Sequence, residues 1–180
     1  PSLVGSVLCI RVSLEERPDP SVFQDTDAVI RTVASCVCGS DLWRYRGIQP
    51  VPKPTPIGHE YVGVVEAVGK AVSTIGPGQF VVGGFLTSDN TCPVCKAGAQ
   101  ANCQHGTGYD GCQAELIRIQ NADGTLIATP QDPEDSMIPH LLAPGEEPAR
   151  AEIADGSGQG RLFEHVLLLF ERLAAMAPLA

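Results

Sequence analysis

The chain has 180 residues, 43% of them hydrophobic, which is enough to bury the core of one domain. Its formal net charge of −9 argues against a nucleic-acid partner, because phosphate backbones bind basic surfaces. The longest unbroken apolar run, 166–170, is too short to span a bilayer, and the first residues lack the basic segment of a secretory signal. We therefore expect a soluble, cytoplasmic protein with no membrane partner.

The first two thirds of the chain are expected to form short strands separated by turns. Glycine and proline punctuate runs rich in β-branched residues, a pattern typical of a β-barrel or a β-sandwich. The four predicted strands are 27–33, 61–69, 80–82 and 114–119. Four prolines between positions 50 and 56 predict an extended loop before the second strand.

The sequence changes character at residue 144. Residues 144–160 are rich in Gly, Pro, Glu and Ala and are predicted to form a linker, whereas 162–176 have the apolar spacing of one helix. This helix is expected either to cover apolar surface of the same chain or to bind a partner. The glycine-rich stretch 156–160 has no preceding strand and the wrong spacing for a dinucleotide fingerprint, so it is assigned to the linker.

The seven cysteines include a cluster that is typical of a metal site. In a reducing cytosol, clustered cysteines are more often metal ligands than disulfides. Cys92, Cys95 and Cys103 have the spacing Cys-x2-Cys-x7-Cys of a closed structural zinc site, and Gly98 lets the chain bend between them. Apart from Cys38, the thiols outside this cluster are predicted to be buried: Cys9, Cys36 and Cys112.

The fourth ligand of this cluster is not fixed by the spacing. Asp89 lies three residues before Cys92, where a regularly spaced cysteine would stand, and it is the favoured candidate. His105 and Cys112 are the alternatives. Without a metal, the cysteines would be free thiols in a surface loop.

A second, open metal site is indicated by Cys38 and the pair His59-Glu60. An open zinc site needs three protein ligands and a carboxylate that orients the histidine, and Asp41 could be that carboxylate. From the residues alone, core or surface roles are the alternative.

These motifs together resemble the zinc-dependent alcohol dehydrogenases, which are medium-chain dehydrogenases/reductases with a GroES-like catalytic domain. The matching segments are 27–31, 38–42, 58–65, the cysteine cluster and 123–130. The resemblance runs from about residue 14 to 143. It implies a mainly β fold with short helices: a GroES-like, partly open β-barrel over 1–143, with the linker and C-terminal helix of 144–180 outside the family pattern.

The resemblance also assigns roles to individual residues. It implies that Cys38 and His59 are catalytic zinc ligands and that Glu60 can approach or ligate the same metal. Ser40 matches the hydroxyl that bonds the substrate oxygen and starts proton release, and Asp41 matches the partner of the zinc histidine. The implied structural zinc ligands are Asp89, in place of the usual first cysteine, Cys92, Cys95 and Cys103. The third catalytic ligand belongs near the linker, where Glu146 is the nearby candidate.

The implied function is hydride transfer between a small alcohol or aldehyde and NAD or NADP, assisted by zinc. The family's dinucleotide-binding half is expected to be absent from these 180 residues, so no cofactor-binding residue is assigned and the isolated chain is expected to be incomplete as an enzyme. The resemblance leaves the oligomeric state open, a homo-oligomer included, because the family's usual interface also lies in that half. The alternative is a non-catalytic zinc-binding module, or a truncated remnant, that acts as a scaffold.

Overall fold

The computed structural model describes residues 15–130 and 132–134, which divide into two compact units. One unit includes residues 37–55, and the other includes 18–36 and the described residues from 56 onward. The elements in chain order are β1 (Ala28–Ser35), α1 (Gly39–Tyr45), β2 (Tyr61–Val68), β3 (Phe80–Gly83), α2 (Pro93–Lys96), the 3₁₀ turn η1 (Gln100–Asn102), β4 (Leu116–Ile119), α3 (Ala122–Thr125) and β5 (Leu126–Ala128). The linker and helix predicted after residue 143 lie outside the described residues.

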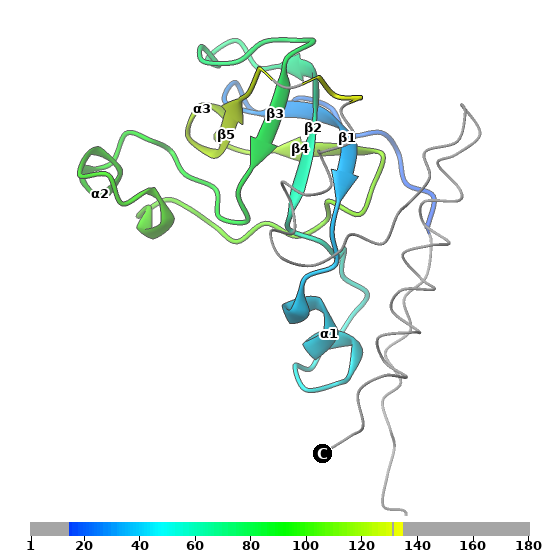
Figure 1. The fold of residues 1–180 in the computed structure, drawn as a ribbon. Coiled ribbons are helices and arrows are strands. Elements are labelled where there is room, and N and C mark those ends of the chain that lie inside the picture. The colour runs from blue at the N-terminus through cyan, green and yellow to red at the C-terminus, as the bar shows by residue number, and fades with distance from the viewer. Residues whose placement is uncertain (1–14, 131, 135–180) are drawn as a thin grey trace, which may run out of the picture. The chain divides into compact units, whose positions relative to one another are not determined.

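All five strands belong to one antiparallel sheet in the second unit (Figure 1). The strand order is β4-β1-β2-β3-β5, so β4 and β5 form the two edges and the sheet is open rather than closed into a barrel. The four strands predicted from the sequence are confirmed, and the fold is mainly β with short helices, as expected. Among the described residues, no helix has the length and apolar character needed to cross a membrane.

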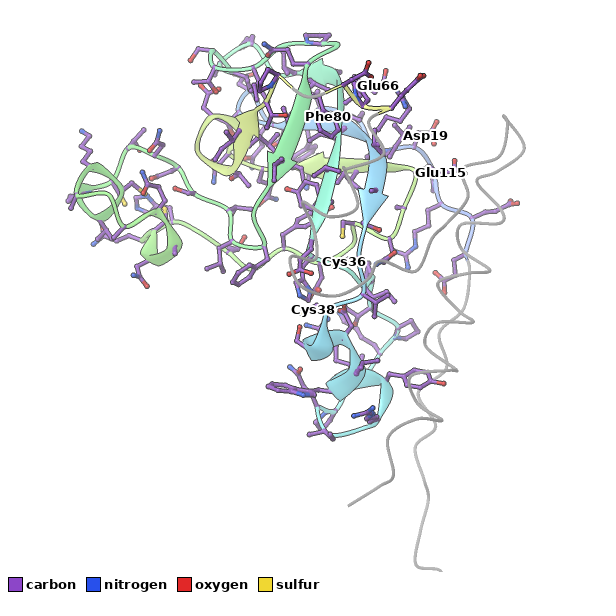
Figure 2. The ribbon with its side chains drawn as sticks, viewed as in Figure 1. Asp19, Cys36, Cys38, Glu66, Phe80 and Glu115 are labelled. Atoms are coloured by element: carbon purple, nitrogen blue, oxygen red, sulfur yellow. The ribbon has the colours of Figure 1, made fainter. Side chains whose placement is uncertain are left out.

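The sheet is covered on both faces because β2 alternates between two apolar clusters. Tyr61 and Val65 point into the larger cluster, and Val62 and Val64 point into the smaller one. The larger cluster also contains Ala28, Ile30, Ile75, Val81, Cys112, Ile117, Ile119, Ala122 and Leu126. Phe80 of β3 closes the smaller cluster (Figure 2). This double burial explains why the sequence of β2 is an almost continuous apolar run rather than an alternating one.

Helix α1 lies in the other unit and was not predicted from the sequence. Its start is stabilised by the carboxylate of Asp41, which accepts a hydrogen bond of 2.9 Å from the backbone N–H of Cys38. Such a contact satisfies a donor that a helix start otherwise leaves unpaired. Cys38, which lies at the start of α1 (Figure 2), is therefore held by a local contact with Asp41, the third residue of the helix.

The pairing of β1 with β2 depends on a glycine. A Cβ added at Gly63 would lie 2.4 Å from the carbonyl oxygen of Arg31 and 2.5 Å from Cγ2 of Ile30. The two backbones therefore approach more closely here than any side chain allows. Gly76, in the turn before β3, has nothing within 4 Å of the same position.

We expect Gly63→Ala to destabilise the fold by about 1–3 kcal/mol, because the methyl group must push β1 and β2 apart. Gly76→Ala is the matched control and should stay within about 0.5 kcal/mol of the wild type. Urea unfolding of both variants measures the difference. Equal stability of the two variants would contradict the close approach.

The turn before β3 is tied to α3 by a single carboxylate. Asp123 accepts hydrogen bonds from the backbone N–H groups of Ser73 and Thr74, both at 3.0 Å, and from their hydroxyls, both at 2.8 Å. Burial raises the pKa of the Asp123 carboxyl, but these hydrogen bonds outweigh burial and lower it.

The variant Asp123→Asn should melt at a lower temperature at neutral pH, because the amide leaves one acceptor oxygen for four donors. The lowered pKa means that the carboxylate stabilises the fold above its unfolded pKa of about 3.9 and loses this effect as the pH falls. The gap in melting temperature should therefore shrink below about pH 4. Asp19→Asn, at an exposed position, is the control and should show no gap at any pH. A gap at Asp123 that is independent of pH would contradict this assignment.

Candidate metal centre and catalytic residues

Three cysteines and one aspartate meet in the lobe that carries α2 and η1 (Figure 1). Cys92 caps the start of α2 and Cys95 lies inside it, while Cys103 follows η1. Gly98 has a φ of 85°, a left-handed conformation that turns the chain back toward the cysteines, as the sequence predicts. Asp89 lies before α2. The four candidate ligand atoms all lie within 4.8 Å of one another.

The distances within this cluster fit a tetrahedral zinc ion. Cys92 Sγ lies 3.4 Å from Cys95 Sγ, and Asp89 Oδ1 lies 3.4 Å from Cys95 Sγ and 3.3 Å from Cys103 Sγ. Ligands at tetrahedral corners, with zinc–sulfur bonds near 2.3 Å, are separated by roughly 3.5–3.8 Å. The donor set, three soft sulfurs and one oxygen, also suits zinc.

Backbone hydrogen bonds prepare one of these thiols to lose its proton. The N–H groups of Cys95 and Gln104 lower the pKa of Cys92. A hydrogen bond with Ser88 lowers the pKa of Cys95, but burial and the contacts with Cys92, Cys103 and Asp89 outweigh it and raise the pKa. A bound cation would favour the deprotonated form of both sulfurs, because metal ligation requires thiolates.

The geometry separates the three candidates for the fourth ligand. Asp89 stands beside the sulfurs. The ring of His105, 67% exposed, contacts the far oxygen of that carboxylate, with Nδ1 2.6 Å from Oδ2. Cys112 is fully buried in the larger apolar cluster, where the sequence placed a buried thiol. The hydrogen bond with His105 is the largest cause that holds the pKa of Asp89 well below its usual range, and it raises the pKa of His105 in turn.

The residues of the second motif pair belong to the two units. Cys38, Ser40 and Asp41 form the entrance and first turn of α1 in one unit, and Asp41 is buried there. His59 and Glu60 precede β2 in the other unit.

His59 is held by two neighbours in its own unit. Its Nδ1 lies 3.4 Å from Oδ1 of Asp110, and both side chains are mostly buried, at 16% and 27% exposed. Its ring meets the ring of Phe85 edge-on, with centroids 6.1 Å apart. The sequence did not single out Asp110, because nothing in the spacing of 59 and 110 signals the contact. A carboxylate at Nδ1 of this kind orients a histidine ring.

The side chain of Glu60 contacts the thiol of Cys36, which was predicted to be buried. The Cys36 thiol donates a hydrogen bond to Oε2 of Glu60, and the Cys36 backbone N–H donates to the Glu60 carbonyl at 3.2 Å. Cys36 is only partly buried, so the prediction of a buried thiol is wrong here. It lies where the chain leaves β1 (Figure 2), so its side chain can reach a neighbour outside the core. The third such thiol, Cys9, lies outside the described residues, as does Glu146.

The comparisons with known proteins agree with the arrangement of strands and motifs. Residues 24–131 match the alcohol dehydrogenase GroES-like domain. The zinc-type alcohol dehydrogenase B of Aspergillus flavus is 38% identical over 133 residues, which cover 71% of this chain and 31% of that protein. A medium-chain reductase/dehydrogenase of an Acremonium species is 39% identical over 133 residues, covering 71% of this chain and 46% of that protein.

Among solved structures, the alcohol dehydrogenase TADH of Thermus sp. ATN1 superposes with a TM-score of 0.63 at 35% identity, covering 67% of this chain and 38% of that one. The chain thus spans less than half the length of these relatives. It belongs to the alcohol dehydrogenase GroES-like domain family, whose members among these relatives are zinc-type alcohol dehydrogenases and medium-chain reductases.

Replacement of Cys95 by Ser should lower the zinc content by about one ion per chain and lower the melting temperature, because a structural zinc contributes directly to folding. Cys112→Ser is the matched control, since it places the same hydroxyl in the core at a distance from the cluster. This control should lose stability and keep its zinc. Elemental analysis and thermal unfolding distinguish the two, and an unchanged zinc content in Cys95→Ser would remove the cluster as a metal site.

Proposed function

We propose that this chain is the catalytic domain of a zinc-dependent, NAD(P)-linked alcohol dehydrogenase, with residues 1–143 as that domain. The observation that carries the proposal is the family match over 24–131, which includes both the cysteine cluster and the motifs at 38–41 and 58–60. The substrate class is a small alcohol or aldehyde. This function would use two metal sites: a structural one that stabilises the domain and a catalytic one that takes part in the reaction.

The catalytic site would use Cys38 and His59 as ligands, with Glu60 able to approach the same metal. The contact of Asp110 with Nδ1 of His59 supports this role, because a carboxylate at a ring nitrogen orients a metal-binding histidine. The thiol of Cys36 holds the carboxylate of Glu60 at a defined position beside His59. Both contacts are of the kind that fixes a metal ligand before the metal arrives.

Proton transfer in this proposal begins at Ser40. Its hydroxyl would accept the proton of the substrate hydroxyl and donate its own proton to a solvent water, so that no charge accumulates on Ser40. When bound, the catalytic zinc supplies Lewis acidity toward the substrate oxygen, and a nicotinamide supplies the hydride acceptor. The family resemblance implies that Asp41 is a partner of the zinc histidine, and its carboxylate accepts a hydrogen bond from the backbone N–H of Cys38.

A non-catalytic zinc-binding module is the second candidate. It is favoured by one observation: the Cys/Asp cluster is complete within one unit, whereas the catalytic residues come from both. Such a module would hold a structural zinc and act as a scaffold.

The two candidates differ in zinc stoichiometry. We expect about two zinc ions per chain in the wild type and about one in Cys38→Ser, because that variant removes a ligand of the catalytic site only. Cys103→Ser is the matched control and should lose the other ion. Elemental analysis of protein purified in metal-free buffer gives these numbers.

One zinc ion per chain that is unaffected by Cys38→Ser would favour the non-catalytic module. A titration with NADH and NADPH, followed by cofactor fluorescence, then separates a domain that binds dinucleotide from one that does not.

A further inference from the structure

Each of the two carboxylate oxygens of Asp89 has its own contacts. Its Oδ1 faces the sulfurs of Cys95 and Cys103 and accepts hydrogen bonds from the backbone N–H groups of Thr91, at 3.0 Å, and Cys92, at 3.2 Å. Its Oδ2 faces the opposite way, 2.6 Å from Nδ1 of His105. One oxygen is therefore directed at the candidate metal position and the other at an imidazole.

The backbone sets His105 in this place. The segments on either side of the lobe pair in antiparallel fashion, with a bridge between Leu86 and Gly108 and hydrogen bonds of 2.9 and 3.0 Å between Thr87 and Thr107. Extending this register three residues from the bridge brings Asp89 opposite His105. The pairing thus brings the segments that carry Asp89 and His105 near each other, and the contact between the two side chains follows at the end of the paired segments.

A glycine keeps the same turn tight. A Cβ added at Gly106 would lie 2.3 Å from the carbonyl oxygen of Thr87 and 3.0 Å from Cβ of Cys103. The turn that carries both Cys103 and His105 is thus pressed against the segment that leads to Asp89. The backbone that carries His105 is therefore held close to the segment of the carboxylate.

An aspartate needs this support more than a cysteine would. A thiolate offers one donor atom, whereas a carboxylate offers two and can rotate between them or bind through both. A hydrogen bond to Oδ2 keeps that oxygen occupied and leaves Oδ1 as the single donor. Outer partners of this kind orient metal ligands and raise metal affinity.

We propose that His105 is a positioning residue, which holds Asp89 as a one-oxygen fourth ligand of a Cys₃Asp zinc site and does not itself bind the metal. This inference rests on the proposed structural zinc at the cluster. It adds to that proposal a reason why aspartate can serve where a cysteine would be expected.

The test is a double-mutant cycle on the full chain, with zinc affinity measured by competition with a chromophoric chelator. His105→Ala should weaken zinc binding at the cluster by about 10–100-fold. His105→Asn, whose amide nitrogen can occupy the place of Nδ1, should recover most of this loss. Gln104→Ala, at the exposed position next to His105, is the control and should bind zinc as the wild type does.

The second arm of the cycle places His105→Ala in the Asp89→Cys background. A thiolate needs no partner to select its donor atom, so here the loss should fall below about 3-fold. Cobalt(II) absorption gives an independent readout of the ligands. The sulfur-to-cobalt charge-transfer intensity should be equal in the wild type and His105→Ala, and it should rise in Asp89→Cys.

Three results would overturn the positioning role. They are unchanged affinity in His105→Ala, an equal loss in both backgrounds, and wild-type affinity in Asp89→Ala, which would make His105 the ligand. Failure of the structural zinc itself reads differently: the wild type would bind no zinc at the cluster, or Cys95→Ser would bind as much zinc as the wild type.

Discussion

The antiparallel pairing of β1 with β2 determines where the candidate functional residues at the end of this sheet lie. The register pairs Ser35, the last residue of β1, with Tyr61, the first of β2. The chain therefore leaves the sheet at the same end before β2 and after β1, and this brings Cys36 against Glu60 although 24 residues separate them in sequence. The close approach at Gly63 holds this register, because a slip of one residue would place a side chain where the backbones meet.

The strands could be predicted from sequence because their signal is local, whereas contacts at the sites could not. Runs such as 61–68 combine β-branched residues with flanking glycines, and the apolar content matches their burial on both faces. Strand β5 has only three residues and two of them are exposed, so it carries little pattern to detect. Helix α1 was missed for a related reason: it has seven residues, and its start depends on the contact of Asp41 with the Cys38 backbone.

At the sites, motif spacing identified the cluster residues but left the fourth ligand open. Asp89, His105 and Cys112 are all near the cysteines in sequence, and only the tertiary structure distinguishes them. Asp89 lies beside the sulfurs, His105 contacts the carboxylate of Asp89, and Cys112 is buried in the core. Asp110 and Cys36 were not recognised as partners of His59 and Glu60 for the same reason. Each reaches its partner through chain pairing that spacing does not encode.

The paired segments that close the lobe also run to His59. Beyond the bridge of Leu86 with Gly108, the N–H of Tyr109 donates to the Phe85 carbonyl at 2.7 Å. The ring of Phe85 and the carboxylate of Asp110 both contact His59. The N–H of Gly111 then donates to the carbonyl of Gly58 at 2.7 Å. The ribbon is thus anchored at one end beside His59 and closed at the other by the Cys/Asp cluster. Phe85 and Asp110, which both contact His59, lie on this ribbon, so the same paired segments that carry these two groups lead to the cluster. Within this unit, the ribbon thus connects the surroundings of His59 with the Cys/Asp cluster.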